Sequence, residues 1–131
     1  MKNTLLAILC CSSGLVFASG LPCAKITNAG GNLLTITNDP NWDDQIVIVN
    51  GRKQHSFKIL LNNNQSVDLC GTWSQFGLNF YDVQGKFAAA TISNLDSSVT
   101  SLVDIYPDDA LNYNIYQQSA NYMAIAIAGI K

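Results

Sequence analysis

Three oxygen-bearing side chains, Asp39, Asn41 and Asp43, stand at alternate positions in the segment 38–44. Carboxylate and amide oxygens are the ligands that Ca²⁺ prefers, and this spacing can turn three of them towards one ion. The segment lacks the downstream glycine and the bidentate glutamate of an EF-hand loop. An Asx-rich connection between strands uses the same residue types, so a calcium site and a plain loop both stay open. No other cofactor is indicated.

The same segment contains Trp42, which is followed by Asp43 and Asp44. An indole ring offers a flat apolar surface with a polar edge, and such a ring beside polar groups suits a sugar face or an interface. We therefore expect Trp42, Asp43 and Asp44 to bind a glycan, a lipid headgroup or a protein surface. We expect the other tryptophan, Trp73, to lie in the core beside Cys70.

Catalytic patterns are weak, so we do not expect an enzyme. The only histidine, His55, is followed by Ser56, which would lie on the opposite face of a strand. The chain has no nucleophile elbow, zinc-protease motif or phosphate-binding glycine loop. An alternative is a polysaccharide hydrolase with an acid pair, formed if Asp108 or Asp109 came within about 5–10 Å of a carboxyl group from loop 39–44.

The first 20 residues have the pattern of a cleaved secretory signal peptide. Lys2 precedes an apolar run at 5–9, and Ala18 supplies a small residue before the expected cleavage. A membrane anchor would need about 20 unbroken apolar residues, and polar residues interrupt this run. The sequence therefore predicts a leader at 1–20, a single domain at 21–131 without a transmembrane segment, and a secreted or periplasmic location.

Once the leader is removed, Cys23 and Cys70 are the remaining cysteines. An even number of cysteines in an oxidising compartment predicts a disulfide. The bond would close a loop of about 48 residues, which corresponds to about 4 kcal/mol in the chain-entropy model.

The composition favours an ordered chain that does not bind nucleic acid. Hydrophobic residues make up 48% of the 131 residues and charged residues 12%, whereas disordered chains are rich in charge. All nine acidic residues are aspartate, which favours turns over helices. The net charge of -2 offers no basic surface for nucleic acid, and it disfavours binding to anionic lipid through charge alone.

Short strand-like runs recur about every 8 to 12 residues, as in sandwiches and small barrels. The runs are 24–28, 33–37, 45–49, 57–61, 66–70, 78–83, 86–92, 99–106, 111–116 and 122–130. Asn50-Gly51 and Gln84-Gly85 mark two hairpin turns, and the apolar run 45–49 predicts a strand buried on both faces. The sequence thus predicts an all-β fold, a small antiparallel β-sandwich or closed barrel of about 8–10 short strands.

The second half of the chain resembles small lipid- or glycan-binding β-sandwiches of the aegerolysin and fungal-lectin kind. The residues that carry the resemblance are Cys70-Gly71, GLNFYD at 77–82, NYNIYQ at 112–117 and NYMAIAIAG at 121–129. It implies a sandwich with a binding role, and it assigns no functional residue. We therefore expect a lectin-like, non-enzymatic secreted binding protein, and the leader and composition fit a bacterial secreted factor. A further alternative is an assembly or inhibitor protein that pairs through an edge strand, for which the uncharged run 122–130 is the candidate.

Overall fold

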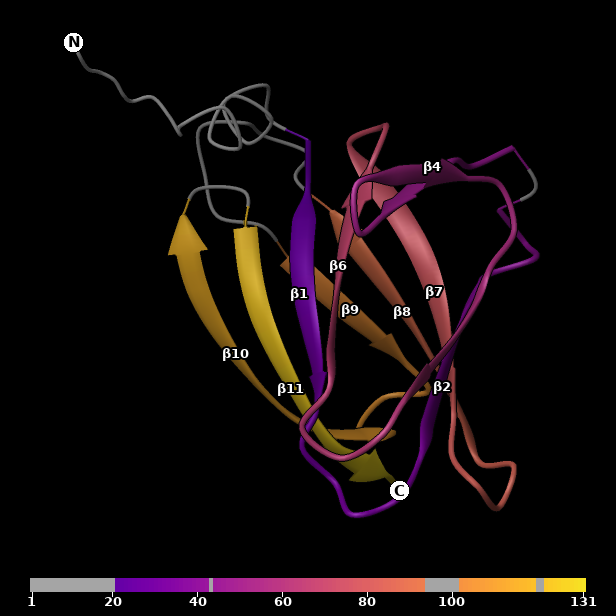
Figure 1. Ribbon diagram of the computed structural model, residues 1–131, viewed down its shortest axis with the longest axis vertical. Coiled ribbons are helices and arrows are strands. Elements are labelled where there is room, and N and C mark those ends of the chain that lie inside the picture. The colour runs from indigo at the N-terminus through magenta and orange to yellow at the C-terminus, as the bar shows by residue number, and fades with distance from the viewer. Residues whose placement is uncertain (1–20, 43, 94–101, 120–121) are drawn as a thin grey trace, which may run out of the picture.

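Two facing β-sheets form the protein in a computed structural model, which describes residues 21–42, 44–93, 102–119 and 122–131 (Figure 1). The described residues form strands and turns and contain no helix. The strands are β1 (Cys23–Asn28), β2 (Leu34–Asn38), β3 (Val47–Val49), β4 (Arg52–Gln54), β5 (Lys58–Leu61), β6 (Ser66–Gly71), β7 (Gln75–Tyr81), β8 (Phe87–Ser93), β9 (Leu102–Tyr106), β10 (Leu111–Ser119) and β11 (Tyr122–Ile130). The all-β prediction is confirmed.

The strands are divided between a six-stranded sheet and a five-stranded sheet. The strand order is β10-β11-β1-β6-β3-β4 in the first, called sheet 1 here, and β5-β2-β7-β8-β9 in the second, called sheet 2. Neighbouring strands are antiparallel except for β1 and β11, which pair in parallel. Both sheets have open edges, so the fold is a sandwich and the closed-barrel alternative is wrong.

Alternating side chains build the core between the two sheets. On β7, Phe76, Leu78 and Phe80 point inwards and are almost completely buried. On β6, Val67 and Leu69 do the same, while the residues between them face outwards. This period of two is the pattern that a strand with one covered face produces.

The two predicted turns are present. Asn50 and Gly51 have φ angles of 48° and 87° and join β3 to β4, which is the backbone that a tight primed turn requires. Gly85 has a φ of 82° in the turn from β7 to β8. There a side-chain oxygen of Asp82 accepts hydrogen bonds from the backbone N–H groups of Gln84 and Lys86, at 2.8 and 2.9 Å.

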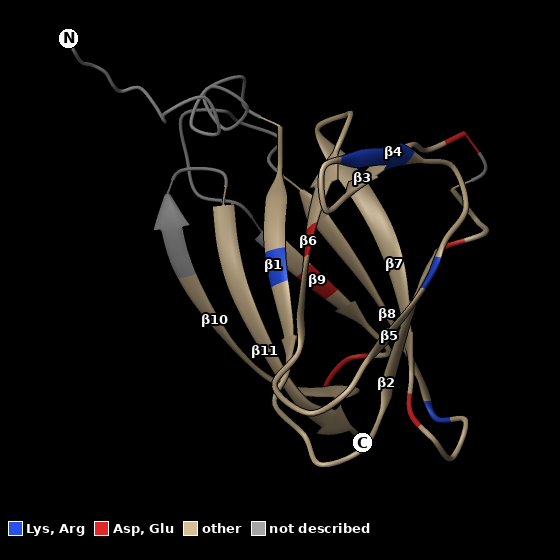
Figure 2. Cartoon of the chain, viewed as in Figure 1, with Lys and Arg blue, Asp and Glu red and all other residues tan. Residues whose placement is uncertain are grey.

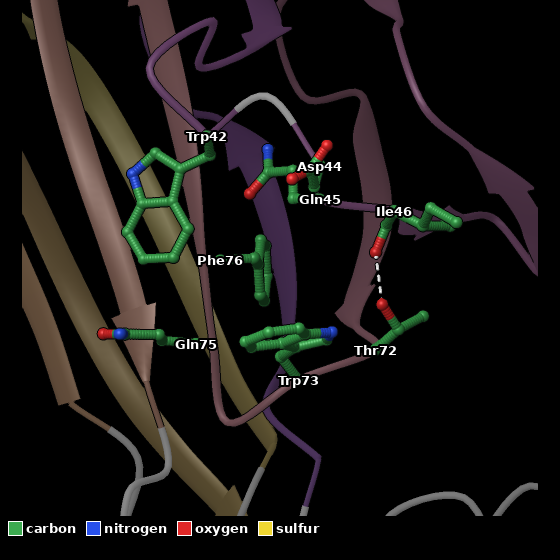
Figure 3. A pocket seen from close by; sticks show the side chains of 8 residues that line it. All are labelled: Trp42, Asp44, Gln45, Ile46, Thr72, Trp73, Gln75 and Phe76. Atoms are coloured by element: carbon green, nitrogen blue, oxygen red, sulfur yellow. Dashed lines mark hydrogen bonds between the residues drawn. The ribbon is translucent and has the colours of Figure 1, made fainter.

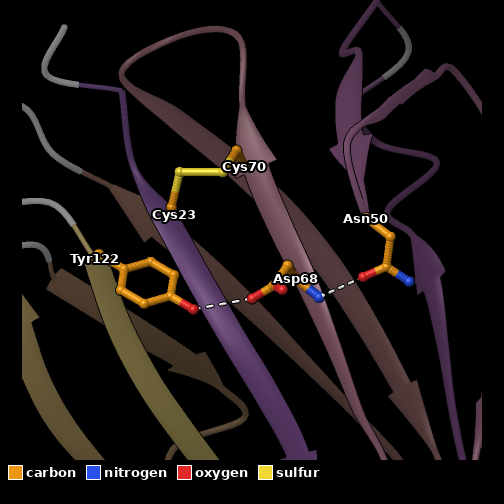
Figure 4. The surroundings of a disulfide bond; sticks show 5 residues. All are labelled: Cys23, Asn50, Asp68, Cys70 and Tyr122. Carbon is orange, nitrogen blue, oxygen red and sulfur yellow. Dashed lines mark hydrogen bonds between the residues drawn. A yellow bond between two sulfur atoms is a disulfide. The ribbon is translucent and has the colours of Figure 1, made fainter. Parts of the chain in front are cut away.

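The predicted disulfide is present between Cys23 on β1 and Cys70 on β6 (Figure 4). The two residues are direct partners in the β1–β6 pair, with their Cα atoms 4.1 Å apart. The bond therefore joins strands that are already neighbours in sheet 1.

Beside this disulfide, a polar chain crosses the outer face of sheet 1 (Figure 4). The Tyr122 hydroxyl donates a hydrogen bond to an Asp68 carboxylate oxygen at 2.9 Å, and the Asp68 backbone N–H donates one to the Asn50 side-chain oxygen at 2.9 Å. Burial, together with the hydrogen bond and the negative charge of Asp68, raises the pKa of Tyr122 to about 12.

Two predictions about individual strands are wrong. Residues 45–49 are not buried on both faces: Val47 and Val49 on the inner face of β3 are buried, but Ile48 on its outer face is only partly buried and Ile46, just before the strand, is 40% exposed. The run 122–130 is not an edge strand, because β11 lies between β10 and β1. Within the described residues, no helix is long and apolar enough to cross a membrane.

Candidate ligand-binding site

A pocket of about 270 Å³ opens at one end of the sandwich. One part of its wall comes from the connection between β2 and β3, and the other part comes from the turn between β6 and β7 and the first residues of β7 (Figure 3). Trp42 and Trp73 enter it from these two segments, which are about 30 residues apart in sequence. A pair of indole rings at one pocket makes this the strongest candidate for a ligand-binding site.

Short-range hydrogen bonds shape the connection that carries Trp42. A side-chain oxygen of Asp39 accepts the backbone N–H of Asn41 at 2.9 Å, and its carbonyl oxygen accepts the N–H of Trp42 at 3.0 Å. The carbonyl of Trp42 in turn accepts the N–H of Gln45 at 3.1 Å. These are the local bonds by which Asx residues form turns, and they set where the indole leaves the backbone.

Gly77 on β7 anchors the same connection to sheet 2. The last residue of β2, Asn38, is paired with Leu78, so Gly77 lies just beyond the reach of β2. The Gln45 amide takes that place, donating to the Gly77 carbonyl at 2.9 Å and accepting the Gly77 N–H at 3.0 Å. The two bonds satisfy the backbone of β7 and hold the connection against it.

The Trp42 indole lies against Gly77, where no side chain blocks it. A Cβ atom at Gly77 would be 2.7 Å from Nε1 and 2.9 Å from Cδ1 of the indole, which is closer than non-bonded atoms pack. Trp42 is half-buried as a result. Trp42 and Asp44 both line this pocket, and their role in binding a ligand stays a prediction.

Trp73 is 72% exposed, so the prediction that it lies in the core is wrong. It stands in the turn after β6, beyond the alternating stretch in which Val67 and Leu69 face the core. The hydroxyl of Thr72 donates a hydrogen bond to the carbonyl of Ile46 at 2.8 Å and ties this turn to the β2–β3 connection. Residues 71–74 contain a glycine and separate two strand-like runs, which is the local signal for a turn.

The calcium site stays a prediction. Asp39 is only 9% exposed, and one of its oxygens already accepts the Asn41 N–H. Asp43, the third residue of the motif and a predicted ligand-binding residue, lies outside the described residues. Among the residues that are described, no group of three or more His, Cys, Asp or Glu side chains is arranged to hold a metal ion.

The two acidic loops proposed as an acid pair lie at opposite ends of sheet 2. Loop 39–44 follows β2, whose last residue, Asn38, pairs with Leu78 in the middle of β7. Asp108 and Asp109 follow β9, whose last residue, Tyr106, pairs with Ala89 near the start of β8. β2 runs towards the Gln75–Ser93 end of the β7–β8 pair and β9 runs towards its Tyr81–Phe87 end, so the two loops leave sheet 2 in opposite directions, which does not favour an acid pair formed from them.

No protein-family model matches this chain, and no curated protein sequence matches it.

Proposed function

We propose that this chain is a small exported, non-enzymatic binding protein that recognises a glycan in the pocket between Trp42 and Trp73. The observation that carries the proposal is the pair of indoles, delivered to one pocket by separate loops that Gln45 and Thr72 hold in place. Aromatic rings that are fixed before binding lose little entropy when a ligand stacks on them.

The chemistry of the wall suits a sugar better than the other ligands considered. The indoles offer flat apolar surface for the C–H face of a sugar ring, and Asp44 and Gln75 add an acceptor and an amide for hydroxyl groups. The volume of about 270 Å³ is just below the range of pockets for drug-sized ligands, roughly 300–1,000 Å³, so a unit of one or two sugar rings fits its scale.

A lipid headgroup or a protein partner has less support at this pocket. None of the described lining residues is Lys or Arg, and the described Lys and Arg residues lie elsewhere, with Arg52 and Lys53 together on β4 (Figure 2). An anionic headgroup would therefore meet no cation in the pocket, while Asp44 would repel it. A protein surface needs a broad contact area, and a concave site of this size offers little.

The wall also favours binding over hydrolysis. Asp44 is the only carboxylate among the described lining residues, whereas retaining and inverting glycosidases both use two carboxyl groups. The proposal therefore assigns Asp44 the role of a hydrogen-bond acceptor.

The test is a glycan array probed with the purified protein, followed by affinity measurements on the best glycan. Trp73→Ala should weaken that affinity about tenfold or more, which is about 1.4 kcal/mol or more, because a stacked aromatic surface is lost. Tyr106→Ala is the matched control, because Tyr106 is 71% exposed against 72% for Trp73 but belongs to β9, outside the pocket. Equal affinities of Trp73→Ala, Trp42→Ala and the parent protein would reject the site, and an array without a bound glycan would reject the ligand class.

A further inference from the structure

Strand β10 differs from every other edge of the two described sheets. The other edge strands are β4, β5 and β9, which have three to five residues, and each carries a charge, from Arg52 and Lys53, Lys58 or Asp104 respectively. Short length and charge are the usual protection of an edge strand against pairing with another chain. β10 has nine residues and no charged residue, so it lacks both protections.

The side of β10 that faces sheet 2 is also only partly covered. Tyr113 and Ile115 pair with the buried residues Ile127 and Ile125 and therefore share their inward direction. Each is nevertheless 37% exposed. In Figure 1, β10 lies outside β9, the last strand of sheet 2, so this part of sheet 1 extends past the sheet that faces it. Apolar surface next to an open row of backbone groups is a pairing site.

The regular part of β10 has Ile115 at its midpoint. Its register with β11 shifts between Asn112 and Tyr113 and again between Gln117 and Ser119, so the stretch between the two shifts is 113–117, with Ile115 at its midpoint. An antiparallel pair of two identical strands around a two-fold axis places the midpoint residue opposite itself. In this register the whole stretch 113–117 is paired, with position 113 opposite position 117.

We propose that the partner of β10 is β10 of a second copy of this chain, paired antiparallel about Ile115. The pairing joins the two copies of sheet 1 into one continuous sheet, sets Ile115 against Ile115, and places Asn114 opposite Tyr116 of the second copy. No like charges meet anywhere along the strand, because β10 has none, and the half-exposed Ile115 side chain gains an apolar neighbour.

The arrangement leaves the pocket free. β10 and β3 lie towards opposite sides of sheet 1, separated by β11, β1 and β6 (Figure 1). The pocket is formed next to β3 and β7, so the second copy at β10 does not approach it. Each dimer thus presents two separate pockets, and this inference does not depend on which ligand they bind.

The mass of the purified protein in solution, measured by light scattering during size-exclusion chromatography, tests the pairing. The expected mass is twice that of one chain. Ile115→Lys should give the mass of one chain, because it sets two ammonium groups against each other at the axis. Leu60→Lys, on the edge strand β5 at a side chain that is 54% exposed, makes the same chemical change elsewhere and should leave the dimer intact.

A mixing experiment separates loss of pairing from loss of folding. Ile115→Lys and Ile115→Asp should each be monomeric alone and should form a mixed dimer together, since the lysine and aspartate then face each other at the axis. Unfolded variants would not regain a dimer on mixing. A monomeric parent protein overturns the proposal and leaves β10 to a different protein, and a dimer that survives Ile115→Lys overturns it as well.

Discussion

The contact between Trp42 and Gly77 makes a sharp prediction about Gly77→Ala. The new methyl group would lie 2.7, 2.9 and 3.2 Å from Nε1, Cδ1 and Cε2 of the indole, so the ring has to move. Van der Waals contact between such atoms is about 3.5–4.0 Å, which requires a shift of roughly 1 Å. The loop that carries Trp42 is also tied to Gly77 through Gln45, so the shift strains those hydrogen bonds.

The free-energy cost of the collision can be isolated with a second strand glycine. Gly129 on β11 has no atom within 4 Å of its ideal Cβ position, so Gly129→Ala should stabilise the protein by roughly 0.5–1 kcal/mol through lower chain entropy. Gly77→Ala gains the same stabilisation from lower chain entropy, but it loses about 1–3 kcal/mol because the methyl group overpacks against the indole. The two variants should therefore differ in unfolding free energy by about 1–3 kcal/mol, with Gly77→Ala the less stable.

Denaturant unfolding followed by circular dichroism measures this difference, and tryptophan emission reports the movement of the indole. A double-mutant cycle adds the decisive control: in the Trp42→Ala background, Gly77→Ala should lose most of its penalty, because the atoms that it collides with are gone. If the two alanine variants are equally stable and tryptophan emission is unchanged, the indole does not lie on Gly77 and the pocket is built differently.

Two further predictions concern sheet 1. Replacing both Cys23 and Cys70 with serine should lower the unfolding free energy by about 4 kcal/mol, which is the loop-closure value for a separation of 47 residues. Denaturant unfolding measures this change, and a loss well under 1 kcal/mol would contradict the prediction. The pKa of Tyr122 is about 12 in the folded protein and 10.0 in the unfolded chain, so the folded protein holds this proton more tightly. The stabilisation from Tyr122 is therefore complete below pH 10.0 and is lost as the pH rises through about 12. Tyr122→Phe should have a smaller loss of stability over that alkaline window than the parent protein, and identical pH profiles would show that Tyr122 is not linked to folding.

The sequence by itself determined most of the strand content. The alternation of apolar and polar residues at 66–70 and 122–130 depends on neighbours two positions apart, and the structure has strands at Ser66–Gly71 and Tyr122–Ile130. The turns at Asn50-Gly51 and Gln84-Gly85 could also be predicted from the sequence, because a turn depends on the φ angles of a few adjacent residues. The Cys23–Cys70 disulfide followed from counting cysteines once a leader was assumed.

Only the tertiary structure decided which strands are edges and which residues share the pocket. The uncharged run 122–130 forms an inner strand because β1 and β10 pair on its two sides. The pairing with β1 joins residues that are more than 90 positions apart in the sequence. Trp73 was expected in the core and instead lines the same pocket as Trp42, because the hydrogen bond from Thr72 and the Gln45–Gly77 pair bring two distant loops together. Local sequence patterns carry no information about such long-range contacts, which form only when the two sheets close over one core.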